Sequence, residues 1–232
     1  MRAVIFDMDG VLFDSEPVYL DIMHDYLVSL GAGFSKSDLN FIVGSSSRTV
    51  YDELERRSGG VVDASTVRAG MIERAEAARI DYARIVEPHA RELLERLRGE
   101  GFVIGLASSA TRYFIDLALD SAALAGYFDV VVSGEQFRES KPNPEIYLHT
   151  LGELGVAARE ALVVEDSSYG IEAAVRAGIR VAAVRDRRFG IDQSAADFRI
   201  DGLHEVWPLV EALTAETRRP GAREETPCIP DA

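Results

Sequence analysis

Two aspartates separated by a single residue, Asp7 and Asp9, stand at the end of an apolar run in the segment AVIFDMDGVLFDSEP (3–17). Two carboxylates this close repel each other, so the pair lowers stability unless a cation, a proton or a reaction uses it. On an extended segment, residues two apart lie on one face about 6.5 to 7 Å apart, which suits a single reacting group. Gly10 follows and permits a sharp turn. The pair therefore predicts a site for a cation or for acid–base chemistry.

Polar side chains of complementary types stand at or just after the ends of later apolar runs or, in the case of Lys141, in the loop that follows such a run. They are Ser108, Ser109, Lys141, Glu165 and Asp166. Magnesium prefers oxygen ligands and usually binds one or two protein carboxylates together with phosphate oxygens and water. A lysine supplies a point charge to a phosphate. Together with the aspartate pair, this set predicts a place for Mg²⁺ and a phosphoryl group.

Short runs rich in Val and Ile predict the strands that position these side chains. They are residues 3–6, 103–107, 129–133, 161–165 and 181–184. Segments with helical spacing lie between them, and Gly101, Gly155 and Gly178 stand where helix C-terminal glycines belong. Continuous apolar strands that alternate with helices predict an α/β fold, a doubly wound parallel sheet covered on both faces. Ligands bind such sheets outside the carboxyl ends of the strands.

The alternation is interrupted from about residue 16 to residue 86, where the pattern is helical and no strand run is convincing. We therefore expect a helical cap domain at 15–86, inserted after the first strand. The α/β catalytic core is then made of residues 1–14 and 87–213. Residues 214–232 are polar, contain prolines and lack periodicity, which predicts a loosely held C-terminal extension.

Asp14 and Ser15 lie in the first of the two linkers that join the predicted domains. They stand just before Pro17, so we expect them to cap the helix that begins there, with proline in its first turn. The second linker is expected near 85–89.

Composition narrows the classes of partner. The chain has 232 residues, 47% of them hydrophobic, and a formal net charge of −14, so nucleic acid and anionic membranes would repel it. Cys228 is the single cysteine, which excludes an internal disulfide and fits a reducing compartment. We find no signal peptide and no apolar run of membrane-spanning length. We expect a cytoplasmic protein, a monomer or weak dimer, that binds a small molecule.

Four segments resemble, in order, the motifs of the haloacid dehalogenase-like (HAD) hydrolase superfamily. They are DMDGVLFDSEP, VIGLASS, SKPNPEIY and VVEDSSYGIEAA. Over roughly residues 1–212 the chain is similar to the branch of phosphatases and β-phosphoglucomutase-like enzymes that carries a helical cap after the first strand. The resemblance implies a Rossmann-like core and an Mg²⁺-dependent phosphatase that acts through an aspartyl-phosphate.

The resemblance also implies a role for each residue of the site. Asp7 would be the nucleophile, and Asp9 would protonate the leaving oxygen and then take a proton from water. Mg²⁺ would be held by Asp7, the backbone carbonyl of Asp9 and Asp166. Glu165 would assist through water or by steadying Lys141. The residues expected to hold the phosphoryl oxygens are Ser108, Ser109 and Lys141.

The cap is expected to select the substrate. Its segment VGSSSRT (43–49) joins two predicted helices and carries hydroxyl groups and an arginine, which suits a sugar, polyol or sugar-acid phosphate. Arg48 is a candidate to bind a carboxylate or second anionic group, with Ser47 beside it. The alternative, that Ser47 caps a helix and Arg48 is solvated, is equally compatible with the sequence.

Four other functions compete with a phosphatase, and one of them, a glycosidase that uses two carboxylates, would not explain Lys141 and Ser108. A mutase of the β-phosphoglucomutase type has a cap histidine shortly after the first motif, and Tyr19 occupies that position here. A dehalogenase lacks the second aspartate, which is Asp9 in this chain. A phosphorylatable receiver-like domain is half this length, has no cap and carries its aspartate after a middle strand. The sequence therefore favours the phosphatase.

Overall fold

The computed structural model describes residues 1–43 and 47–217, and for residues 47–49 it describes the backbone alone. Its centre is a parallel sheet with the strand order β3-β2-β1-β4-β5-β6. The strands are β1 (Ala3–Phe6), β2 (Val103–Ser108), β3 (Val130–Ser133), β4 (Ala161–Glu165), β5 (Arg180–Val184) and β6 (Phe198–Ile200). The predicted α/β parallel-sheet fold is confirmed. The edge strand β6 was not expected, because three residues that include Arg199 carry too little apolar pattern to be recognised.

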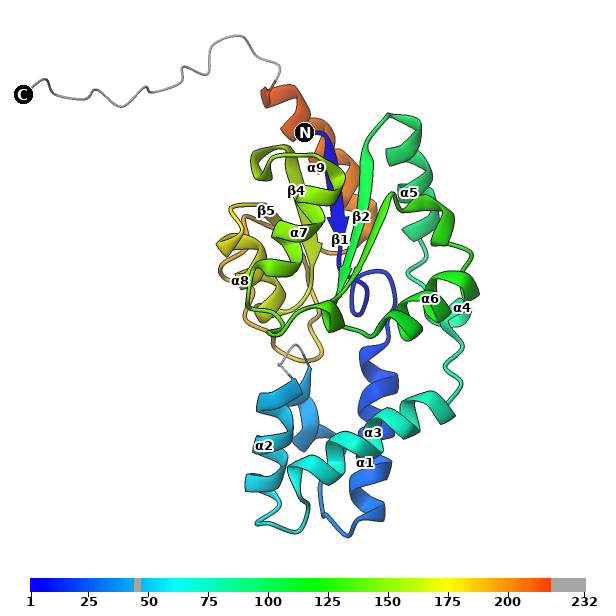
Figure 1. Cartoon of the computed structure of the whole chain (residues 1–232), viewed down its shortest axis with the longest axis vertical. Helices are drawn as coiled ribbons and strands as arrows, with labels where there is room; N and C mark the ends of the chain where they lie inside the picture. The colour runs from blue at the N-terminus through cyan, green and yellow to red at the C-terminus, as the bar shows by residue number, and fades with distance from the viewer. Residues whose placement is uncertain (44–46, 218–232) are drawn as a thin grey trace, which may run out of the picture.

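Helices cover both faces of the sheet, as Figure 1 shows. One face packs against α5 (Ala90–Gly99), α6 (Arg112–Ser121) and α9 (Val206–Thr217), and the other against α7 (Glu145–Leu154) and α8 (Ser168–Arg176). Strand β1 is buried on both sides, since Val4 and Phe6 belong to the first cluster and Ala3 and Ile5 to the second. This burial explains why its residues are apolar without alternation.

The register of the central strands brings distant parts of the chain to one place. Phe6 at the end of β1 pairs with Leu106 of β2 on one side and with Val164 of β4 on the other. Because the strands are parallel, the residues that follow them emerge at the same end of the sheet. The chain segments after β1, β2 and β4 therefore meet there, at the end that faces the cap (Figure 1).

The interval between β1 and α5 is helical in its described part, as expected. Its elements are α1 (Glu16–Ser29), a 3₁₀ helix (Lys36–Ile42), α2 (Ser47–Arg57), α3 (Ala64–Ala77) and the short α4 (Tyr82–Ile85). The first four share a separate cluster of buried side chains, which includes Leu27, Leu39, Leu54 and Val67. Helix α4 instead packs against α6, and Tyr82 belongs to the core cluster. The boundaries predicted for the cap stay a prediction, and packing places α4 on the core side.

The two linkers between cap and core pair with each other. The Asp14 N–H donates to the Ile85 carbonyl at 2.8 Å, and the Glu87 N–H donates to the Leu12 carbonyl at 2.8 Å. Phe13 forms the antiparallel bridge that lies between these bonds. The cap is thus attached through a short paired hinge.

Helix α9 ends later than the sequence predicted. Residues 214–217 were expected to begin a loose extension, but they continue the helix to Thr217. Val210 and Leu213 anchor this turn in the core, and the Thr214 hydroxyl donates to the Val210 carbonyl at 2.7 Å. The rest of the predicted extension, with Cys228, lies outside the described residues. No helix in the described part of the chain is long and apolar enough to cross a membrane.

Candidate active site

Three buried carboxylates meet where β1 and β4 end. Asp7 follows β1, Glu165 ends β4 and Asp166 follows it, and each offers an oxygen within 4.8 Å of the oxygens of the other two. Asp7 and Asp166 are only 8% and 4% exposed. Among the described donors, none gives a hydrogen bond to the Asp166 carboxylate. A buried carboxylate without a donor, beside a second one, fits a divalent cation.

The pKa shifts in this cluster also favour a bound cation. Burial, and then the charges of Glu165 and Asp9, raise the pKa of Asp7 to about 7, although Lys141 acts in the opposite direction. Burial and the charges of Glu165 and Asp7 also raise the pKa of Asp166 well above its usual value. The cluster thus has more negative groups than one lysine neutralises, and an added cation would stabilise their charged forms.

Lys141 links the nucleophile candidate to the neighbouring strand. Its ammonium group donates to Asp7 Oδ1 at 2.6 Å, to Glu165 Oε1 at 2.8 Å and to the Ala107 carbonyl at 3.0 Å. The side chain is 6% exposed. Burial opposes its charge, but Asp7 and Glu165 outweigh burial and raise the pKa of Lys141 well above the usual value. Lys141 is therefore a fixed positive charge beside the Asp7 carboxylate.

The hydrogen bonds of Glu165 indicate a supporting role. Oε1 accepts from Lys141 and from the Tyr147 hydroxyl at 3.0 Å. Oε2 accepts from the N–H groups of Asp166 and Ser167 and from the Ser167 hydroxyl, at 2.9, 2.9 and 3.0 Å. Although burial alone would raise it, the pKa of Glu165 is lowered, chiefly by the charge of Lys141. With both oxygens in use, Glu165 steadies Lys141.

Asp9 accepts a hydrogen bond from Ser15, whose side chain was predicted to cap α1 instead. Ser15 precedes α1, but its side chain makes no capping bond, because its backbone is helical (φ −87°, ψ −20°) rather than extended. Its hydroxyl instead donates to Asp9 Oδ1 at 2.6 Å. Burial raises the pKa of Asp9 more than this bond and the charge of Lys141 lower it.

Gly10 allows the turn between the two aspartates and α1, as predicted. Its φ is +76°, and a β-carbon there would lie 2.1 Å from Asp166 Oδ2, so no other residue fits. The turn is closed by the Gly10 N–H on the Phe13 carbonyl at 2.8 Å and the Leu12 N–H on the Met8 carbonyl at 2.9 Å. The main chain therefore lies against a metal-ligand candidate.

The two serines after β2 differ in exposure. Ser108 is 1% exposed, and its hydroxyl accepts from the Ala110 N–H at 3.1 Å. Ser109 is exposed, and both line the same cleft as Lys141 and the carboxylates. The residues after β2 thus lie beside the carboxylate cluster, as expected because β2 is the neighbour of β1 in the sheet.

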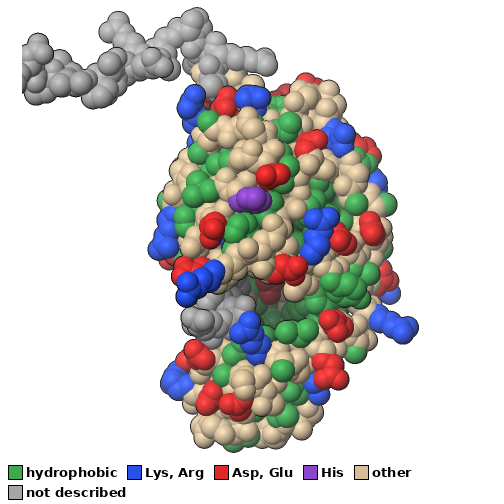
Figure 2. All heavy atoms as spheres, in the orientation of Figure 1, with side chains coloured by type: hydrophobic (Ala, Val, Ile, Leu, Met, Phe, Trp, Pro, Cys, Tyr) green, Lys and Arg blue, Asp and Glu red, His purple; other side chains and the backbone are tan. Residues whose placement is uncertain are grey.

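This cap–core cleft has a volume of about 420 Å³ and lies between the carboxyl end of the sheet and the cap, where Figure 2 shows a hollow in the surface. Its polar floor includes Asp7, Asp9, Ser108, Ser109, Lys141, Glu165 and Asp166. Its cap wall is largely apolar and includes Met23, Ile42, Val50, Met71 and Ile72. The volume suits a small metabolite. The side chains of Ser47 and Arg48 lie outside the described residues, so their predicted role stays a prediction.

Three supporting residues, Ser15, Tyr147 and Gln193, were not predicted to act at the site. Gln193 donates from its amide to the Asp166 carbonyl at 2.6 Å and to the Val184 carbonyl at 2.7 Å, which fixes the main chain behind the cluster. Tyr147 supports Glu165 from α7. Tyr147 and Gln193 act on partners 18 and 27 residues away, which no local pattern signals, whereas Ser15 lies only six residues from Asp9 and within the first motif.

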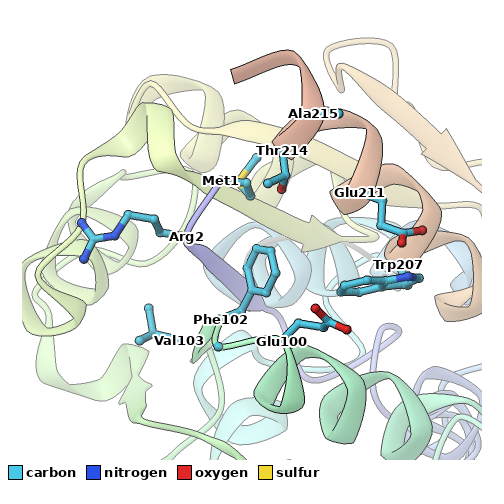
Figure 3. A pocket seen from close by; sticks show the side chains of 10 residues that line it. Met1, Arg2, Glu100, Phe102, Val103, Trp207, Glu211, Thr214 and Ala215 are labelled. Carbon is cyan, nitrogen blue, oxygen red and sulfur yellow. The ribbon is translucent and has the colours of Figure 1, made fainter. Parts of the chain in front are cut away.

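A second cavity lies at the opposite, amino end of the sheet (Figure 3). This amino-end groove has a volume of about 840 Å³. It is lined by Met1, Arg2, Glu100, Gly101, Phe102, Val103, Trp207, Glu211, Thr214 and Ala215. Phe102 and Trp207 contact edge to face at 6.1 Å between ring centres. Glu100 and Glu211 are exposed, so the groove lacks converging buried carboxylates, although the Trp207 indole N–H is buried and has no hydrogen-bond partner in the described structure.

Comparison with known proteins agrees with the geometry. The family described as haloacid dehalogenase-like hydrolase matches residues 4–184, which include the ends of β1, β2 and β4 that carry the polar residues of the cap–core cleft. The chain belongs to this hydrolase family. The resemblance inferred from the four motifs is thereby confirmed, as is the prediction of an enzyme of the hydrolase class.

Relatives of this hydrolase include named phosphatases. The phosphorylated carbohydrates phosphatase of Thermotoga maritima is 33% identical over 208 residues, covering 85% of this chain and 88% of that protein. Hexitol phosphatase B of Escherichia coli K12 is 31% identical over 214 residues, covering 88% and 93%. The crystal structure of β-phosphoglucomutase from Clostridium difficile shares the fold, with a TM-score of 0.78, 19% identity and coverage of 94% and 100%.

Proposed function

We propose that this hydrolase is an Mg²⁺-dependent phosphatase of a small phosphorylated metabolite, such as a sugar, polyol or sugar-acid phosphate. The observation that carries the proposal is the contact of Lys141 with Asp7 beside a buried carboxylate, Asp166, that has no donor in the described structure. The names of the relatives that act on phosphorylated carbohydrates and hexitols support the substrate class.

Asp7 acts as the nucleophile in this mechanism. Lys141 holds Oδ1, which leaves the other oxygen of Asp7 to attack phosphorus. The phosphorus–oxygen bond to the leaving alcohol breaks as the aspartyl-phosphate forms, and Asp9 gives its proton to the leaving oxygen. Asp9 then takes a proton from water, which attacks phosphorus and releases inorganic phosphate. The raised pKa of Asp9 suits the first of its two steps.

The surrounding residues hold the reacting groups. Lys141, Ser108 and Ser109 bind the phosphoryl oxygens, and Glu165 keeps the lysine in place. Asp7, the Asp9 backbone carbonyl and Asp166 would hold Mg²⁺, which when bound neutralises the carboxylates and the phosphate charge. Ser15 orients Asp9 by its hydrogen bond to Oδ1.

A mutase of the β-phosphoglucomutase type is the alternative. At the position where such mutases carry a cap histidine, Tyr19 lines the cleft, and its hydroxyl lies 3.1 Å from that of Tyr82. No histidine is among the described residues that line the cap–core cleft. A tyrosine with a strongly raised pKa, caused first by burial, is a poor proton carrier at neutral pH. This favours the phosphatase.

The test is phosphate release from a panel of sugar, polyol and sugar-acid phosphates, with Mg²⁺ or with EDTA. Release that needs Mg²⁺ and is lost in Asp7→Asn supports the proposal. If sugar phosphates are instead interconverted in the presence of a bisphosphate, without net release, the mutase replaces it. Arg48→Ala on the same panel tests the cap prediction, since unchanged selectivity would remove Arg48 from substrate binding.

A further inference from the structure

Tyr19 and Tyr82 form a hydrogen-bonded pair between the cap and the core that the proposed chemistry does not use. Their hydroxyl oxygens lie 3.1 Å apart. Tyr19 lines the cap–core cleft from α1, the helix whose Leu20 and Met23 pack in the cap cluster. Tyr82 belongs to α4 and to the core cluster. One end of this hydrogen bond therefore lies at the cleft and the other in the core.

The burial of Tyr82 fixes the direction of this hydrogen bond. Tyr82 is completely buried and packs edge to face on Phe13, with 5.5 Å between the ring centres. Each phenol has one hydrogen to donate, and among the described residues Tyr19 alone is a partner for the Tyr82 hydroxyl. If Tyr19 donated to Tyr82, the Tyr82 hydrogen would be shut in the core without an acceptor, at a cost in free energy. Tyr82 therefore donates to Tyr19.

The hydrogen of the Tyr19 hydroxyl then remains for a ligand in the cleft. Apart from Tyr82, none of the described residues lies within hydrogen-bond distance of this hydroxyl. Burial, and then the charges of Asp9 and Tyr82, raise the pKa of Tyr19 far above its usual value, so the phenol keeps its hydrogen at neutral pH. Asp9, which acts on Tyr19 electrostatically, is the residue proposed to protonate the leaving oxygen. The Tyr19 donor thus stands beside the leaving part of the substrate.

We propose that Tyr82 donates to Tyr19 and that Tyr19 in turn donates to an oxygen atom on the leaving part of the substrate, other than the oxygen bonded to phosphorus. The inference rests on the proposed phosphatase function and deepens it, because it assigns recognition of a sugar or polyol to a neutral donor in the cleft. Tyr19 is a substrate-binding residue. Tyr82 lies outside the cleft lining and is a positioning residue that acts through Tyr19.

The physical reason is that a fixed neutral donor selects for an acceptor. Hydroxyl and ring oxygens of a sugar or polyol can accept from Tyr19, whereas a leaving part without such an oxygen leaves the donor unpaired. One neutral hydrogen bond changes affinity by about three- to tenfold. Because Tyr82 orients the hydroxyl before the substrate binds, less conformational freedom is lost on binding.

The experiment compares two substrates and four variants. The substrates are a hexitol phosphate and phenyl phosphate, whose leaving part has no oxygen besides the one bonded to phosphorus. The variants are Tyr19→Phe, Tyr82→Phe, the double variant of both, and Tyr113→Phe as a matched control. Each replacement removes one phenolic oxygen and keeps the ring. Tyr113 lies on α6, is 59% exposed and is outside the cleft lining.

Melting temperatures test the direction of the bond between the two tyrosines. Tyr19→Phe should lower the melting temperature by about 2–6 °C, because the Tyr82 hydroxyl is left in the core without a partner. Adding Tyr82→Phe removes that hydroxyl, so the double variant should melt at a higher temperature than Tyr19→Phe. Tyr113→Phe should melt as the wild type does. A double variant that melts no higher than Tyr19→Phe would overturn the direction of the bond.

Kinetics test the contact with the substrate. Tyr19→Phe should lower the ratio of kcat/KM for hexitol phosphate to that for phenyl phosphate by about three- to tenfold, mainly through KM. Tyr82→Phe should lower it by about twofold, because Tyr19 keeps its hydrogen but loses the bond that orients it. The double variant should match Tyr19→Phe, because Tyr82 acts through Tyr19. Tyr113→Phe should leave the ratio as in the wild type.

Two kinetic outcomes overturn the assignment. Equal losses on both substrates in Tyr19→Phe would make Tyr19 a structural residue without a contact to the leaving part. Losses that multiply in the double variant would show that Tyr82 acts independently of Tyr19. If the wild type releases phosphate from neither substrate, the phosphatase function itself fails, whereas the melting temperatures still test the bond between Tyr82 and Tyr19. Failure of the function is thus distinguishable from failure of the role of Tyr19.

Discussion

The cap–core cleft and the amino-end groove lie at opposite ends of one parallel sheet, and the groove, at about 840 Å³ against 420 Å³, is the larger. Both contain acidic and aromatic residues. In the cleft, however, carboxylates that follow β1 and β4 are buried and converge, whereas Glu100 and Glu211 of the groove are exposed. Strand direction explains the difference, because the loops that follow parallel strands all emerge at one end. Convergence of buried polar groups identifies a site better than volume does.

The largest effect is expected for Asp7, the proposed nucleophile in the cleft. Asp7→Asn keeps the shape but removes the attacking carboxylate, so phosphate release should fall at least about 1,000-fold. Single-turnover assays with Mg²⁺ would measure it. Glu100→Gln in the groove is the matched change and should retain wild-type activity. Comparable losses in both variants would contradict the contrast between the two cavities.

Lys141→Met should lower both activity and stability. It leaves Glu165 buried without its cation, and breaking a buried ion pair costs about 3–5 kcal/mol of unfolding free energy. The loss of a fixed charge next to the phosphoryl group should reduce kcat about 100-fold. Urea unfolding at pH 7 and steady-state kinetics measure the two effects, and a stability equal to that of the wild type would show that the carboxylates are satisfied without the lysine.

Trp207→Ala tests whether the amino-end groove contributes to stability but not to activity. It removes the contacts of Trp207 with Phe102 and with the Arg96 guanidinium, 4.5 Å above its ring, and should lower the unfolding free energy by about 3 kcal/mol. Activity per folded molecule should be unchanged, because the groove lies at the other end of the sheet. A change in KM would instead connect the groove to the reaction.

Gly170→Ala should be destabilising, although alanine normally favours a helix. A β-carbon at Gly170 would lie 1.6 Å from Glu165 Oε1, so the support of Lys141 must move, at a cost of about 1–3 kcal/mol. Gly152→Ala in α7 is the matched control, because its β-carbon would meet nothing within 4 Å, and it should stabilise by about 0.5–1 kcal/mol. Thermal unfolding of both variants measures these changes. Equal shifts of the melting temperature would contradict the close approach of Gly170 to Glu165.

A further prediction concerns the pH dependence of stability in the metal-free enzyme. Burial raises the pKa of Asp7 from its usual value near 4 to about 7, so the contribution of Asp7 to stability is full below pH 4 and is lost as pH rises toward 7. In EDTA, the melting temperature should therefore decline more steeply from pH 5 to 7.5 in the wild type than in Asp7→Asn. Parallel curves for the two proteins would refute the raised pKa.

Much of the fold could be read from local pattern. Strands β1 and β4 coincide with the predicted runs at 3–6 and 161–165, because buried parallel strands are continuous in Val, Ile and Leu. The short edge strand β6 and the last turn of α9 were missed, since their stability comes from neighbours in space rather than from their own residues.

For the candidate site, too, some features follow from the local sequence and others from tertiary packing. The spacing of Asp7 and Asp9 and the polar residues after the later strands predicted which side chains form the candidate site, because strand direction sends them all to one end of the sheet. Only the tertiary structure decided that Ser15 bonds Asp9 instead of capping α1 and that Tyr147 joins Lys141 on Glu165. Local periodicity specifies where a strand ends, whereas the partner of a buried polar group depends on how the folded chain packs around it.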